Sequence, residues 1–251
     1  MNKILVSRNN ISTNSDSVLI DGNNIRIKNS GIYSLEYDDV DKIDLNIIVD
    51  DYVDGVLFES SFLGDICISN RYVINKGSLR VNKFYDNDSV REVIDIDLLS
   101  DGSRIDYRFS NICKNSEDYV ININHKNKFS VSNINNKSIA MDGSKLNFII
   151  NSSVGKEDFG SVLNQNTRIV TIGNSDSKIS PNMFIDCDDV SAVHGSVIGT
   201  FKDEMVFYLM SRGIDYNEAI KLLVKGYLFS NVDVDNVLRE RILKVIDKYW
   251  R

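Results

Sequence analysis

Residues 183–229 read MFIDCDDVSAVHGSVIGTFKDEMVFYLMSRGIDYNEAIKLLVKGYLF, and the pattern of the sequence changes within this stretch. Before Gly199, short segments alternate apolar and polar residues, which is typical of half-buried β-strands. After Gly199, apolar residues recur at helical spacing, and Thr200 and Asp215 are suitable helix N-caps. Gly213 is a good helix terminator because glycine accepts a left-handed conformation. The sequence therefore predicts a β domain over residues 1–199 and a helical domain over residues 200–251.

The β domain extends upstream as many short strand-like segments separated by turns. Residues 93–99 (VIDIDLL) and 104–109 (RIDYRF) are examples, with the turn Asp101-Gly102 between them. The chain has 29 Asn but only 3 Ala, and 26 of these Asn precede Gly199, so a mostly helical fold is improbable. Such strands permit a sandwich, a barrel or a solenoid. A solenoid is favoured over an antiparallel domain because Asn can form ladders at repeated solenoid turns.

The C-terminal domain is predicted to contain three helices, of which the third spans about residues 235–249. About fifty residues are too few to bury much of a core of their own. We therefore expect the helices to dock, either on the protein's own β domain or on a partner protein.

The net charge and the absence of several sequence motifs argue against some classes of function. The formal net charge is −7, which does not favour a nucleic-acid-binding surface. Neither a membrane-spanning run of about 18 apolar residues nor a secretory signal is predicted. Three widely spaced cysteines fit the reducing cytoplasm. No phosphate-binding glycine motif is present, so the chain is not expected to bind a nucleotide.

One dense group of metal-ligand side chains stands out. It contains Cys187 and His194, with Asp186, Asp188 and Asp189 as weaker candidates. A thiolate and an imidazole suit iron, an iron–sulfur cluster or zinc, but they supply only half of a tetrahedral site. The other ligands would come from another chain or from solvent. The alternative is an unreactive buried cysteine and a hydrogen-bonded histidine.

Three segments resemble the C-terminal signature of the SufB/SufD family, the scaffold subunits of the SUF iron–sulfur cluster assembly machinery. They are DDVSAVHGSVIG at 188–199, FYLMSRGI at 207–214 and AIKLLVKGYL at 219–228. The resemblance implies a right-handed parallel β-helix (a β-solenoid) followed by a small α-helical domain. It also implies a non-enzymatic protein, because ATP hydrolysis belongs to a partner.

The resemblance further implies two partners and one site. Family members pair through the C-terminal end of the β-helix, as homodimers or heterodimers, and His194 matches the family histidine near which a transient cluster is held. The helices are expected to dock the ABC ATPase SufC through residues that include Phe207, Tyr208, Met210, Arg212, Gly213, Ile220, Leu223 and Tyr227. Gly195 after His194 is similar to SufD-type members.

Two other functions stay open. Plentiful carboxylates would also suit a carbohydrate-active β-helix enzyme, which would carry an exposed groove lined by a carboxylate pair. A purely structural partner subunit, without cluster ligands of its own, is the other alternative.

Overall fold

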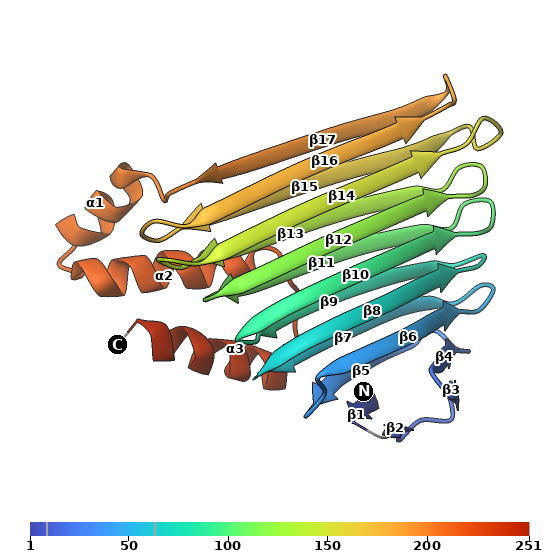
Figure 1. Ribbon diagram of the computed structural model, residues 1–251, viewed down its shortest axis with the longest axis horizontal. Helices are drawn as coiled ribbons and strands as arrows, with labels where there is room; N and C mark the ends of the chain where they lie inside the picture. The colour runs from blue at the N-terminus through green and yellow to red at the C-terminus, as the bar shows by residue number, and fades with distance from the viewer. Residues whose placement is uncertain (9, 63, 251) are drawn as a thin grey trace.

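The computed structural model describes residues 1–8, 10–62 and 64–250, which form seventeen strands followed by three helices (Figure 1). The strands are β1 (Asn2–Ser7), β2 (Asn10–Thr13), β3 (Val18–Asp21), β4 (Asn24–Ile27), β5 (Gly31–Asp38), β6 (Lys42–Val49), β7 (Asp54–Phe62), β8 (Asp65–Ile74), β9 (Ser78–Asp86), β10 (Ser89–Leu98), β11 (Arg104–Cys113), β12 (Ser116–His125), β13 (Val131–Ala140), β14 (Lys145–Val154), β15 (Ser161–Thr171), β16 (Asp176–Ile185) and β17 (Val190–Gly199). The helices are α1 (Asp203–Ser211), α2 (Tyr216–Phe229) and α3 (Asn236–Tyr249).

The strands form a flattened β-solenoid. From β5 onward, odd-numbered strands pair in parallel in one sheet and even-numbered strands in the other, so each turn contributes one strand to each sheet. One turn takes 24 residues between Asp54 and Ser78 but 31 between Asn136 and Thr167. This drift explains why no strict repeat is visible in the sequence. The predicted mainly β solenoid with a small helical C-terminal part is confirmed.

Asparagine ladders run across the outer face of the even-numbered sheet. The Nδ2 atom of Asn122 donates to Asp95 Oδ1 (2.9 Å), Asn151 to Asn122 (2.8 Å) and Asn182 to Asn151 (2.9 Å). The ladders therefore lie on strands. The prediction that they would lie at the turns is wrong. Parallel in-register strands place the same face of successive turns about 4.8 Å apart, which lets one side-chain amide bond the next.

The two ends of the solenoid differ. At the N-terminal end, β2 pairs with β1 and β3 with β4 in antiparallel hairpins, which cover the first parallel strands. At the C-terminal end, β16 and β17 are the last strands of their sheets and pair on one side only. We call the end formed by β16 and β17 the open end.

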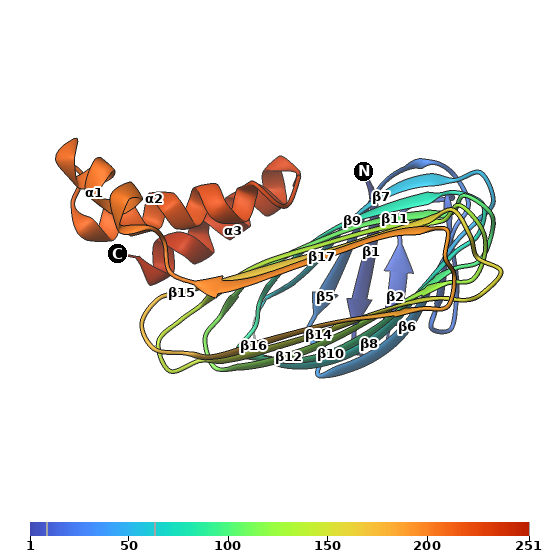
Figure 2. The same ribbon diagram turned by 90° about the horizontal axis from the view of Figure 1, so that it is seen from above.

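Helices α2 and α3 pack on the outer face of the odd-numbered sheet, as Figure 2 shows. The shared apolar cluster joins outward strand residues to helix residues, including Phe84, Ile112, Ile139, Val170, Val224, Leu228, Leu238, Ile242 and Ile246. The amide of the buried Asn231, between the helices, donates to the carbonyl oxygens of Phe109 (2.7 Å) and Asn135 (3.2 Å). The helices were expected to dock either on the protein's own β domain or on a partner. In the structure, α2 and α3 pack on the β domain.

Two of the predicted helix ends are confirmed and one is shifted. The Asp215 carboxylate accepts a hydrogen bond from Glu218 N (3.1 Å), and Gly213 has a positive φ of 86°. The N-cap of α1 is Lys202 and not Thr200, and it makes no side-chain capping bond. In the described part of the chain, every helix is too short or too polar to span a lipid bilayer.

The interior between the sheets holds buried ionisable groups as well as apolar side chains. Lys83, Glu59 and Glu92 are enclosed there, and Lys83 Nζ lies 3.1 Å from Glu59 Oε1 and also pairs with Glu92. The Tyr85 hydroxyl donates to Glu59 Oε1 (2.7 Å). Burial raises the pKa of Glu92 to about 7, against the opposing effect of Lys83. One ammonium group thus serves two buried carboxyl groups.

Candidate functional site

The open end exposes apolar side chains together with the free edges of two strands. Val193 is 60% exposed and Phe184 is 61% exposed, and Ile185, Val197 and Ile198 are exposed as well. Unpaired strand edges readily pair with another chain, and exposed apolar surface favours burial in an interface. The open end therefore has the properties of an association surface.

His194 lies in the middle of β17, with its side chain directed toward the solenoid interior. Its Cα partner on β15 is Gln165, which is buried, and in-register residues of parallel strands point to the same side. No later turn covers β17, so His194 is exposed although it faces inward. The fold thus presents the imidazole in the middle of β17, on the open end.

The other predicted ligands lie apart from His194. Asp186, Cys187, Asp188 and Asp189 form the loop between β16 and β17 at the corner of the solenoid. A strand rises about 3.3 Å per residue, which places His194 roughly 13 Å along β17 from its first residue. Among the described residues, no three His, Cys, Asp or Glu side chains converge on one possible metal position. Within the described part of one chain, Cys187 and His194 therefore do not belong to a convergent group of three such side chains.

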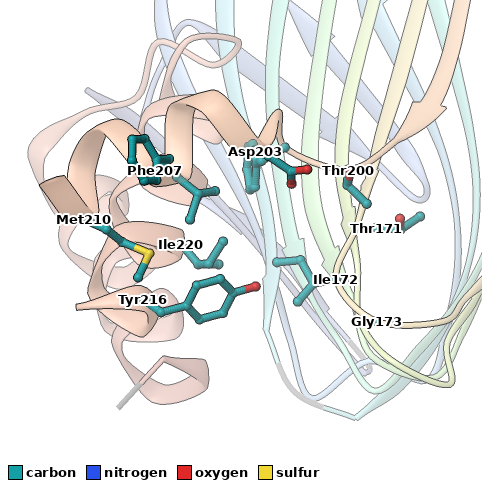
Figure 3. A pocket seen from close by; sticks show the side chains of 11 residues that line it. Thr171, Ile172, Gly173, Thr200, Asp203, Phe207, Met210, Tyr216 and Ile220 are labelled. Atoms are coloured by element: carbon teal, nitrogen blue, oxygen red, sulfur yellow. The ribbon is translucent and has the colours of Figure 1, made fainter. Parts of the chain in front are cut away.

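Helix α1 exposes a second apolar surface, which we call the α1 surface, formed by Met205, Phe207, Tyr208 and Met210. None of the residues of α1 is buried, and Phe207 is 73% exposed. Beside the α1 surface, a groove of about 340 Å³ runs between α1, the start of α2 and the β15–β16 loop (Figure 3). Its walls include Ile172, Phe207 and Met210.

The remaining predicted docking residues do not belong to the α1 surface. Ile220 is buried in the cluster that attaches α2 to the sheet, and the Tyr227 hydroxyl donates to Arg168 O (2.6 Å). Leu223 is half-buried, whereas Arg212 and Gly213 are exposed at the end of α1. In this structure Ile220 and Tyr227 hold α2 on the β domain.

His125, the second histidine, is a buried structural residue. Its Nδ1 atom lies 2.6 Å from Ser130 Oγ and its Nε2 atom lies 2.8 Å from Ser132 Oγ. Burial lowers the pKa of His125 to about 4. Because all three side chains are buried, they do not offer a substrate a Ser–His pair.

The buried His125 makes stability depend on pH. The unfolded chain binds a proton at this residue below about pH 6.5 and the folded chain only below about pH 4. We therefore expect this group to lower the free energy of unfolding by up to about 3 kcal/mol as the pH falls through that window. Urea unfolding at several pH values should show that His125→Gln removes this slope.

The wild-type curve also contains two opposing contributions. Burial raises the pKa of Glu92 and of Glu117 to about 7. Both groups therefore make the protein more stable as the pH falls from about 7 toward the unfolded value of 4.5. The informative quantity is the difference between the His125→Gln and wild-type curves, and a difference that is constant with pH would contradict the assignment.

Two outward carboxylates of the solenoid, Asp97 and Asp106, are engaged in ion pairs. Asp106 binds Arg80 (3.0 Å) and Arg108 (2.8 Å), and Asp97 binds Arg71 and Lys126. A glycosidase needs one carboxyl group that can give up a proton and another that faces it across the substrate. Carboxylates held by cations do not favour the carbohydrate-active alternative.

Sequence reasoning missed two features of the open end. The first is the exposure of Phe184 on β16 and of Val193 and Val197 on β17, for which the signal was a strand with apolar residues on both faces. The second is Gln165, the only glutamine in the chain, which lies in register with His194. The pairing of Gln165 with His194 could be predicted only if the number of residues in that solenoid turn were known.

Comparisons with known proteins identify the family. The model described as "SUF system FeS cluster assembly, SufBD core domain" matches residues 72–227. An iron–sulfur cluster assembly SufBD family protein of Mycobacterium leprae is 44% identical over 71 residues, which are 27% of this chain and 18% of that protein. SufD of Escherichia coli is 34% identical over 85 residues, 34% of this chain and 19% of that protein.

A longer match extends into the β domain. SufD of Bacillus subtilis is 26% identical over 140 residues, which are 53% of this chain and 31% of that protein. The matched part of this chain thus spans less than a third of the length of these three relatives. Because the family model covers more than half of the sequence, the chain belongs to the SufBD family of the SUF iron–sulfur cluster assembly system.

Proposed function

We propose that this protein is a non-catalytic scaffold subunit of a SUF-type complex, pairing with a second SufB/SufD-type subunit through the open end and binding an ABC ATPase through α1. The observation that carries the proposal is the difference between the two ends of the solenoid. At the N-terminal end the sheets finish in the four-residue hairpin strands β2 and β3, whereas at the C-terminal end they finish in the ten-residue strands β16 and β17, which carry exposed apolar side chains and His194. Its three cysteines are free, which supports a place in the cytoplasm.

The cluster is the cargo of such a scaffold, held briefly at the subunit interface. His194 would supply an imidazole from the centre of the open end. Cys187 of the same chain lies in the loop at the solenoid corner and His194 lies in the middle of β17, which supports a thiolate supplied by the second subunit. A cluster with few protein thiolates, divided between two chains, is released more easily than one held by four cysteines of one chain.

The position of α1 supports a link between the ATPase and the cluster. Only residues 200–202 separate the end of β17 from the start of α1. A partner that moves α1 would therefore pull on the strand that carries His194. The α1 surface has the exposed aromatic and methionine side chains that protein interfaces favour.

The cluster site can be tested by anaerobic reconstitution with iron and sulfide in the presence of the pairing subunit and the ATPase. We expect His194→Ala to abolish the visible absorbance of the cluster, and Cys187→Ser to lower it where the second subunit is another copy of this chain. Cys67→Ser is the matched control, because Cys67 lies on β8 far from the open end.

The results separate the alternatives. If both variants assemble clusters as the wild type does, the assignment of the site is refuted. If His194→Ala forms the complex normally and clusters are unaffected, the protein is a structural partner without ligands of its own. Gel filtration of each variant with its partners reports complex formation independently of the cluster.

A further inference from the structure

Gln165 carries an unpaired acceptor beneath the open end. The residue is 4% exposed, and its amide nitrogen donates to Ser152 Oγ (2.7 Å) and to Asn182 O (3.2 Å). The carbonyl oxygen of Asn182 can only accept a hydrogen bond, so it fixes the orientation of the amide with the nitrogen toward it. The Oε1 atom is buried and has no donor among the described residues. A buried acceptor without a donor is costly, so Oε1 is available for a further hydrogen bond.

His194 is the side chain placed to supply that donor. Gln165 and His194 are Cα partners on neighbouring parallel strands, which lie about 4.8 Å apart, and both side chains point inward. His194 is exposed, so its ring is free to rotate. A neutral imidazole has one N–H donor and, on its other ring nitrogen, one lone pair. If the N–H donates to an acceptor, the lone pair of the other nitrogen stays free to bind a metal.

We propose that Gln165 is a positioning residue, whose Oε1 atom accepts the N–H of His194 and so determines which ring nitrogen is left to bind iron. The part that concerns iron rests on the proposed function, whereas the hydrogen bond itself does not. Histidines that bind metals almost always donate their other ring N–H to an acceptor, which fixes the tautomer and the ring orientation. Gln165 provides this acceptor from below, on the side away from the second subunit.

Asn136 provides a matched control within the same interior. It is also buried, its Nδ2 atom donates to Thr167 Oγ1 (2.9 Å), and its Oδ1 atom has no donor among the described residues. Its column continues through Thr167 to Ser196 and not to His194. An effect of unpaired interior acceptors in general would therefore appear at Asn136 as well as at Gln165.

The hydrogen bond can be tested in the free protein, without iron. The chain contains only two histidines, so ¹⁵N-histidine labelling gives two sets of ring signals, and His125 with both nitrogens bonded to serines is an internal reference. At a pH where the ring is neutral, we expect one dominant tautomer of His194. Gln165→Met, which keeps the length but loses the acceptor, should lower the tautomer ratio about fivefold, the size expected for one hydrogen bond.

Two further variants make the result specific. Gln165→Glu keeps an acceptor oxygen and should retain the dominant tautomer, and Asn136→Leu should leave it unchanged. Equal populations of the two tautomers in the wild-type protein would overturn the proposal without any variant. A tautomer ratio that is the same in Gln165→Met and in the wild type would overturn it too.

Reconstitution with iron and sulfide then separates this proposal from the proposed function. Gln165→Met should weaken iron binding by about 10–100-fold, and Gln165→Glu should restore it. If His194→Ala binds iron normally while the tautomer still depends on Gln165, the scaffold assignment of His194 fails and the positioning role stands. If the tautomer does not depend on Gln165 but His194→Ala abolishes binding, the positioning role alone fails.

Discussion

Replacement of Lys83 by methionine is expected to lower the free energy of unfolding by about 3–5 kcal/mol, because it leaves buried carboxyl groups without their cation. Lys83, Glu59 and Glu92 are all enclosed between the two sheets, where water cannot replace the lost partner. Tyr85 would still donate to Glu59, but a hydroxyl does not neutralise a charge. Equilibrium urea unfolding, followed by circular dichroism, measures the change.

The matched control is the same substitution at an exposed ion pair. Lys3 Nζ lies 3.5 Å from Glu36 Oε2, and the Lys3 side chain is half exposed. Lys3→Met should cost less than about 1 kcal/mol, since exposed ion pairs contribute little. If the two substitutions cost the same, the buried cluster does not hold the charges inferred from its geometry.

The loss in Lys83→Met should also depend on pH. Burial raises the pKa of Glu92 to about 7 in the wild type, so its contribution to stability is present at low pH and is lost as the pH rises through about 7. Without Lys83, ionising Glu92 in the folded state costs more. The difference in stability between wild type and variant should therefore grow from about pH 4.5 toward pH 8.

Replacement of both Phe207 and Tyr208 by aspartate should weaken binding of the cognate ABC ATPase by roughly 1000-fold, since aromatic residues central to an interface commonly contribute 2 kcal/mol or more each. Both side chains are exposed on the α1 surface and pack against little of the protein itself, so the fold should be preserved. Isothermal titration calorimetry with the purified ATPase gives the dissociation constants.

Val237→Asp is the control for a general effect of added charge. Val237 is an exposed apolar residue on α3, which lies against the odd-numbered sheet away from the α1 surface. We expect this variant to bind the ATPase as the wild type does. Undiminished binding by the Phe207→Asp, Tyr208→Asp double variant would show that the ATPase docks elsewhere.

Local sequence patterns predicted the elements well, because the signals act over a few residues. Alternating apolar residues indicated strands, and Asp215 and Asp235 each cap a helix through a side-chain bond to the backbone. Thr200 was a suitable N-cap because threonine is favoured at that position. In the structure, residues 200–202 link β17 to α1, which begins at Asp203. The residue at which a helix begins depends also on where the preceding strand ends and how the chain leaves it.

The packing of the helices was not predictable from their periodicity. The apolar faces of α2 and α3 fitted either the β domain or a partner, and periodicity does not say what covers a face. The fold offers Phe84, Ile112 and Ile139 as an outward apolar row on the odd-numbered sheet. This row exists only because successive turns bring those residues to the same side, and α1, which lies outside it, has no buried residue.

The amino-acid sequence determines the alternation of strands and turns, the start of α2 and α3 and the resemblance to SufB/SufD proteins, since all of these depend on neighbouring residues. The tertiary structure decides which distant side chains meet. Turns of the solenoid vary from 22 to 31 residues, so a sequence without its register does not show that Gln165 lies under His194. Nor does it show that Lys83 lies between Glu59 and Glu92, because only the closing of the two sheets brings those charges together.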